Sequence, residues 1–144
     1  MKAIKLFSLL AILIAFTSCD TLQQATNTTG GALFSLNGNW RLGSNTPDNT
    51  LINSVVTVSP LVSDGVLSTV ANNSQCYREK DILWRNIKSN NNGGYTLETL
   101  ISNCSSGSLN YMGASIYVVN SNEIRVTGVN ASGQQSVQTW TRIR

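Results

Sequence analysis

The chain has 144 residues, of which 41% are apolar and 12% are charged, and its formal net charge is +3. This length suits one domain, and ordinary apolar content with so little net charge argues against intrinsic disorder. Two basic residues, Lys2 and Lys5, lie in a segment that we expect to be removed, which leaves eight basic residues against seven acidic ones and a net charge of +1. A near-neutral chain has no electrostatic footprint for nucleic acid.

The first 18 residues have the features of an export signal. Two lysines precede the apolar run 6–16, which is too short for a bilayer core that needs about 20 apolar residues. The run leads into Phe16-Thr17-Ser18-Cys19, and small residues before a cysteine resemble the lipobox of bacterial lipoproteins. The resemblance implies a signal peptide over residues 1–18, acylation of Cys19 with palmitate or a similar chain, and attachment to a membrane through that lipid. The alternative is an ordinary secretory signal in which Cys19 is incidental.

The residues after the cysteine bear on which membrane holds the protein. Asp20 follows Cys19, and an aspartate there retains enterobacterial lipoproteins in the inner membrane. The Asn- and Ser-rich composition instead resembles small lipoproteins of the Bacteroidetes group, in which outer-membrane placement is common. We therefore expect a protein of the bacterial cell envelope, with the outer membrane favoured and the inner one left open. Residues 19–35 are mostly polar and contain Gly30-Gly31, which predicts a flexible tether.

Residues 36–144 carry short runs of β-forming residues separated by turn residues, which predicts an all-β domain. The expected strands cover residues 36–44, 52–59, 65–71, 77–88, 95–103, 114–120, 123–129 and 135–143. Strands at such short and regular spacing are typical of a sandwich or a barrel. We predict a small eight-stranded antiparallel up-and-down barrel, with a β-sandwich as the alternative.

Cys76 and Cys104 remain as an even pair once Cys19 is lipidated, which predicts a disulfide in an exported protein. They flank the expected strands 77–88 and 95–103, and the midpoint between them, position 90, lies close to the centre of the intervening turn. A simple hairpin with one bulge would therefore bring the two cysteines nearly opposite each other. The C-x-x-C spacing of redox-active pairs is absent, so a structural bond is favoured over a redox role.

Two short motifs stand at the two ends of the expected domain. Gly38-Asn39-Trp40 opens the first strand, and Trp140-Thr141-Arg142 closes the last. Together they resemble the calycin pattern of lipocalins and avidins. The resemblance implies that the first and last strands pair, that Trp40 plugs the closed end of the barrel, and that Arg142 lies across its ring. Gly38 would allow close approach of the chain there. Trp140 and Arg142 share one face of the last strand, and we expect this face to point inward because tryptophan buries more apolar area than the alternatives.

Residues for catalysis are scarce. The chain has no histidine, which removes imidazole-based triads, proton shuttles and metal sites. Glu79 and Asp81 would share one face of the strand expected over 77–88 and could act as acid and base, but a solvated strand edge explains them better. Without a nucleophile motif, a phosphate loop or metal-ligand spacing, the sequence predicts no catalytic residues, no metal, no cofactor and a protein that is not an enzyme.

Four aromatic residues are the candidate ligand-binding set: Trp84, Tyr95, Tyr111 and Trp140. Aromatic groups line the interiors of barrels that bind small ligands, although a filled core explains them as well. Two function classes therefore stay open. One is a lipid-anchored barrel that binds a small apolar ligand, and the other is a non-catalytic structural or interaction lipoprotein, such as an inhibitor, with a filled barrel or sandwich. A continuous interior cavity above about 300 Å³ would favour the first class, and a filled interior with an exposed apolar patch would favour the second.

Overall fold

The structure is a computed structural model that describes residues 35–59, 61–102, 104 and 109–144. The signal peptide, the lipidation site Cys19 and all but the last residue of the tether predicted from the sequence lie outside these residues. The described part contains eight strands: β1 (Gly38–Thr46), β2 (Val55–Val58), β3 (Gly65–Thr69), β4 (Ile82–Ser89), β5 (Tyr95–Ser102), β6 (Leu109–Asn120), β7 (Glu123–Val129) and β8 (Gln135–Ile143). No helix long and apolar enough to cross a membrane occurs among the described residues.

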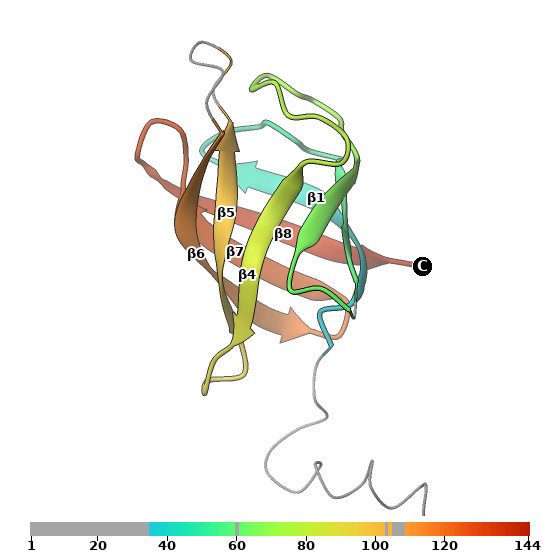
Figure 1. The fold of residues 1–144 in the computed structure, drawn as a ribbon. Helices are drawn as coiled ribbons and strands as arrows, with labels where there is room; N and C mark the ends of the chain where they lie inside the picture. Colours follow the sequence, from blue (N-terminus) through green and yellow to red (C-terminus); the bar gives the residue numbers. More distant parts are fainter. Residues whose placement is uncertain (1–34, 60, 103, 105–108) are drawn as a thin grey trace, which may run out of the picture. The chain divides into compact units, whose positions relative to one another are not determined.

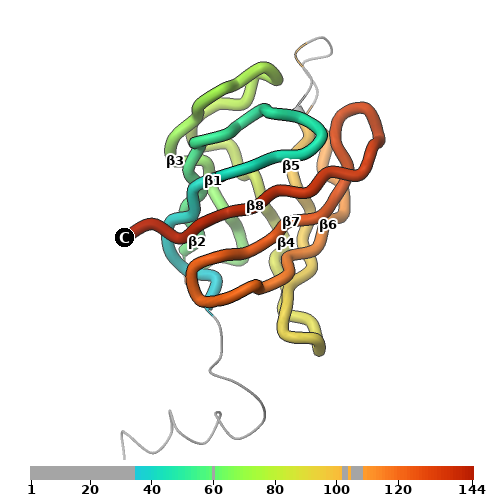
Figure 2. Tube along the Cα trace, turned by 180° about the vertical axis from the view of Figure 1, so that it is seen from behind, coloured from blue at the N-terminus to red at the C-terminus, as the bar shows by residue number. Residues whose placement is uncertain are grey.

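The strands form a closed antiparallel barrel in sequence order, and β8 pairs with β1 to complete it. Figures 1 and 2 show β8, in red, running beside β1, in teal. In the closing pair, Trp40 lies opposite Arg142 and Arg41 lies opposite Thr141. The predicted eight-stranded up-and-down barrel is therefore confirmed, and the alternative of a sandwich is wrong.

Up-and-down order divides the connections between two ends of the barrel. The end that we call the tether end contains residues 35–37, the β2–β3 loop 59–64, the β4–β5 turn 90–94 and the β6–β7 turn 121–122. The opposite end, which we call the loop end, contains the four other connections. In Figure 1 the β4–β5 turn, in yellow, marks the tether end at the bottom of the barrel.

The interior of the barrel is packed with side chains. Trp40, Trp84 and Trp140 are each 0% exposed, and the rings of Trp84 and Trp140 meet edge to face with centroids 5.0 Å apart. Aliphatic side chains from β1, β2, β3, β6 and β7 fill the space around them, among them Leu42, Val56, Leu67, Ile116 and Ile124. Each tryptophan buries about 150–250 Å², so three of them account for much of the core of so small a barrel.

The charged segment before β4 differs from its prediction. The strand expected over 77–88 begins only at Ile82, because residues 78–81 close a turn. The backbone N–H of Arg78 donates to the Asp81 carboxylate at 2.8 Å, and Lys80 adopts a φ of 75°. A side chain that captures a nearby backbone donor competes with strand pairing. Glu79 and Asp81 therefore do not share a strand face, and the geometry proposed for an acid–base pair is wrong.

The start of β6 also differs from its prediction. The strand begins at Leu109 and not at residue 114, because its backbone pairs with β5 along the whole length of β5, as far as the pair Ser102 and Leu109.

The predicted disulfide is confirmed, with Cα atoms 5.3 Å apart. Its setting is less regular than a hairpin, since Cys76 lies in the β3–β4 loop and Cys104 follows the end of β5. The expected single bulge is present at Asn86, where φ is 55° and the β4–β5 register shifts by one residue between Arg85 and Lys88. The bond thus ties the long β3–β4 loop to the end of β5.

Candidate functional site

Arg142 closes the tether end of the barrel. Its guanidinium carbon lies 4.3 Å from the centre of the Trp40 ring, within the range of a cation–π contact. Its Nε donates to the carbonyl of Ser121 at 3.0 Å, and its two terminal nitrogens donate to the carbonyls of Asn37 and Ser35. The arrangement predicted from the two end motifs is therefore confirmed, and it pins the entering chain across the end of the barrel.

Trp40 and Gly38 complete this closure. The indole N–H of Trp40 donates to the carbonyl of Leu36 at 2.8 Å, and this bond holds residues 35–37 against the end of the barrel. Gly38 has a φ of +125°, and a Cβ there would stand 2.9 Å from the Nη1 atom of Arg142. Only glycine adopts such a φ without strain, so the Gly-x-Trp motif has a physical reason at this position.

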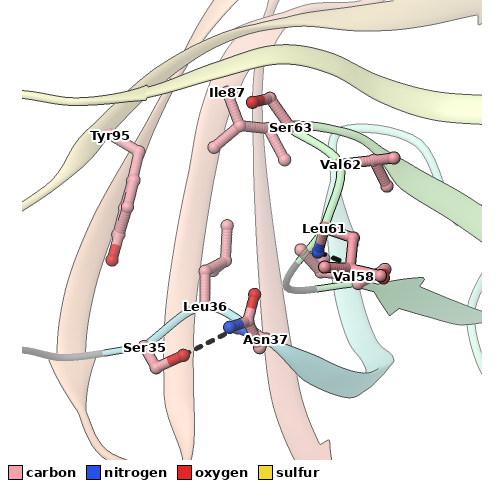
Figure 3. A pocket seen from close by; sticks show the side chains of 10 residues that line it. Ser35, Leu36, Asn37, Val58, Leu61, Val62, Ser63, Ile87 and Tyr95 are labelled. Carbon is pink, nitrogen blue, oxygen red and sulfur yellow. Dashed lines mark hydrogen bonds between the residues drawn. The ribbon is translucent and has the colours of Figure 1, made fainter.

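A pocket of about 280 Å³ opens at the tether end, between residues 35–37 and the β2–β3 loop. Figure 3 shows Leu36 in its middle, with Tyr95 on one side and Leu61 and Val58 on the other. Five of its ten lining residues are aliphatic, and Ser35, Asn37, Ser59 and Ser63 supply polar groups. Such a lining suits a small molecule with an apolar body and a polar end.

The β2–β3 loop holds an apolar tip beside this pocket. Leu61 is 91% exposed and Val62 is 51% exposed. The loop is attached to β4, because the Ile87 N–H donates to the Ser63 carbonyl at 2.9 Å and the Asn86 N–H donates to the Asp64 carboxylate at 3.3 Å. An exposed apolar tip that continues into an apolar pocket forms a patch, which marks a binding surface more often than scattered apolar residues do.

Tyr95 is half-buried at the side of the pocket. Burial raises the pKa of its phenol, while a hydrogen bond with the Leu36 backbone and the charge of Arg142 oppose the rise. The phenol is therefore uncharged at neutral pH, and it contributes a neutral hydroxyl to the pocket wall.

The four aromatic residues proposed as a ligand-binding set do not come together. Trp84 and Trp140 lie in the packed core, whereas Tyr95 lines the tether-end pocket. Tyr111 lies on the outside of the barrel, where its hydroxyl donates to the Ile82 carbonyl at 2.9 Å. Of the set, only Tyr95 stands at a pocket of appreciable size among the described residues.

A polar cluster on the outside of β4, β5 and β6 was not predicted from the sequence. The guanidinium of Arg85 lies 3.6 Å from the centre of the Tyr111 ring and donates to Glu98 at 2.6 Å. Asn86 also donates to Glu98, at 2.8 Å, and the hydrogen bonds from Arg85 and Asn86 lower the pKa of that carboxyl. These contacts link three adjacent strands. The β4–β5 register, which sets Arg85 opposite Glu98, is the signal that would have revealed them.

At the loop end, the described residues surround a cavity of about 30 Å³, lined in part by Asn45, Tyr77 and Ser136, which is room for about one water molecule. Ser136 donates to Asn45 at 3.0 Å, and Asn45 donates to the Thr50 carbonyl at 3.1 Å. These two hydrogen bonds link β8 to β1 and β1 to the β1–β2 loop at this end of the barrel.

Within the described ranges, no cluster of three or more His, Cys, Asp or Glu side chains could hold a metal ion. No protein-family model matches the chain, and no curated protein or solved structure matches it either. The lipoprotein and calycin resemblances therefore rest on the residues described above.

Proposed function

We infer that this protein is a lipid-anchored component of the bacterial cell envelope whose barrel is a non-catalytic scaffold that binds through its outer surface. The observation that carries the inference is the packed interior, in which three tryptophans are each 0% exposed. A ligand inside the barrel would have to displace at least one of them. Removing a buried tryptophan side chain costs about 3–5 kcal/mol, a large fraction of the stability of a small domain.

The lipid anchor is supported by the sequence Phe16-Thr17-Ser18-Cys19 after the short apolar run. The test is metabolic labelling with tagged palmitate in a bacterial host, followed by membrane fractionation. The wild-type chain should carry the label and lose its first 18 residues, whereas Cys19→Ser should carry none and keep its signal peptide or be released unlabelled. A labelled Cys19→Ser protein would refute the anchor.

A second candidate function is the binding of a small amphipathic molecule at the tether end. It is favoured by the pocket of about 280 Å³ with its aliphatic lining and Tyr95. This volume is just below the range of about 300–1,000 Å³ that is usual for ligand pockets. The outward binding of a partner surface therefore remains our first proposal.

Titration with the fluorescent apolar probe N-phenyl-1-naphthylamine separates the two candidates. A packed scaffold should give no saturable signal. Saturable binding would favour the pocket instead if Leu61→Asn weakens it about tenfold, which is the change expected when most of one leucine contact is lost. Leu109→Asn is the matched control, since Leu109 is an exposed leucine, 57% accessible, at the loop end. Saturable binding that neither variant changes would point to the interior and contradict both candidates.

A further inference from the structure

The apolar patch lies at the end of the barrel where the described chain begins. The pocket lies against residues 35–37, and the chain that leads back to Cys19 joins the barrel at Ser35. Leu61 and Val62 stand at the tip of the neighbouring loop. Any membrane that holds Cys19 is therefore connected to the end of the barrel that carries its exposed apolar tip.

We propose that the tether end docks on the lipid bilayer itself, with the side chains of Leu61 and Val62 inserted at the headgroup level. This proposal rests on the lipid anchor at Cys19 that we inferred above. Residues 19–34 are 16 residues, and a chain of that length spans at most about 55 Å when fully extended. Short tethers raise the local concentration of the attached surface to about the millimolar range, so even a weak contact with the bilayer is occupied for much of the time.

The shape of the tip suits a bilayer. Leu61 projects almost wholly into solvent, while hydrogen bonds at Ser63 and Asp64 hold the loop that carries it. A pre-formed apolar tip loses little conformational freedom when it inserts. Ile87 and the buried Leu36 line the same pocket behind the tip, so apolar side chains support the inserted residues from behind.

The charges at the tether end also suit a lipid surface. Its described charged side chains show a small basic excess, and they are Asp64, Lys88, Glu123, Arg142 and Arg144. Basic residues near the surface are attracted to anionic lipid headgroups. The excess is small, so apolar insertion supplies most of the contact and docking should depend only weakly on salt.

Quenching of tryptophan fluorescence by brominated lipid tests the docking directly. The full lipidated protein is reconstituted on vesicles of phosphatidylcholine and phosphatidylglycerol whose acyl chains carry bromine. Leu61→Trp places a reporter at the proposed contact, and Leu109→Trp places a matched reporter on an exposed leucine at the loop end. The three native tryptophans, each 0% exposed, give a background that both variants share and that the wild-type protein measures.

We expect strong quenching of the added tryptophan in Leu61→Trp and background quenching in Leu109→Trp. Replacing Val62 with Asp in the Leu61→Trp protein should lower the equilibrium constant for docking about tenfold, as the loss of one buried apolar side chain predicts. Equal quenching of the two reporters, with both proteins floating with the vesicles, overturns the docking. A blue shift without quenching, together with dimers in sedimentation, assigns the patch to a second copy and also overturns it. Flotation reports the anchor separately, and a protein that does not float refutes the anchor and the docking with it.

Discussion

Replacing Arg142 should destabilise the barrel more than any other single change at a part-exposed side chain. Arg142→Ala removes three hydrogen bonds to backbone carbonyls, on Ser121, Asn37 and Ser35, and the contact with the Trp40 ring at 4.3 Å. Hydrogen bonds from charged groups contribute about 1.5–3 kcal/mol each when buried, and an exposed cation–π contact adds about 0.5–1 kcal/mol. Because water reaches this side chain and replaces part of these bonds, we expect a loss of about 3 kcal/mol.

Urea and thermal unfolding of the chain from residue 19 onward, carrying Cys19→Ser for solubility, measure this loss. A loss of about 3 kcal/mol lowers the midpoint of thermal unfolding by about 12 °C in a domain of this size. Arg142→Lys should lose roughly half as much, since lysine keeps the charge but not the planar fork of donors. Arg144→Ala, two residues further along, is the control and should change stability by less than about 0.5 kcal/mol. If Arg142→Ala is as stable as this control, the closure of the barrel does not depend on the two end motifs.

Three further predictions concern other parts of the barrel. Reduction of the bond between Cys76 and Cys104, which are 28 residues apart, should lower the free energy of unfolding by about 3–4 kcal/mol, and two freely titrating thiols in the oxidised folded protein would contradict it. The Glu98 carboxyl, whose pKa is lowered by Arg85 first and Asn86 second, should stabilise the fold fully above the ordinary glutamate pKa and lose this contribution as the pH falls through its lower folded-state pKa. Carbon NMR titration should show the Glu98 pKa rising in Arg85→Ala, and an unchanged pKa would refute the assigned cause. Trp84→Ala should lower the free energy of unfolding by about 3–5 kcal/mol and open an apolar cavity that added indole fills. Trp84→Phe should lower it much less, because the buried Trp84 N–H has no partner among the described residues. Equal stability of the two variants, with no effect of indole, would contradict a packed interior.

The sequence predicted the architecture because alternation and turn residues are local signals. Seven of the eight strands start close to their expected positions or earlier. The pairing of the first and last strands was expected from the motifs at Trp40 and Arg142, and these two residues lie opposite each other in the structure. The strand expected from residue 77 failed because the Asp81 side chain captures the Arg78 N–H, a contact that strand-forming propensity does not include.

The site was harder to predict, since it depends on contacts between distant segments. Nothing in the sequence separated Trp84 from Tyr95 as aromatic candidates. In the structure Trp84 is buried in the core, whereas Tyr95 lines the pocket. The apolar tip at Leu61 carried no periodic signal, because it stands in a loop between two short strands. Its exposure becomes visible only when the loop is placed against β4.

The indole N–H signals of Trp84 and Trp140 in a proton–nitrogen NMR spectrum test whether binding takes place outside a packed barrel. Octanoate, which has an apolar chain and a polar end, is added to the isotope-labelled protein until any shifts saturate. We predict that the Trp84 and Trp140 signals do not move, because their rings pack against each other 5.0 Å apart inside the barrel. Shifts confined to Trp40, whose N–H donates to Leu36 at the pocket, would fit binding at the tether end. Saturable shifts of both Trp84 and Trp140 would place the ligand inside the barrel and contradict the account.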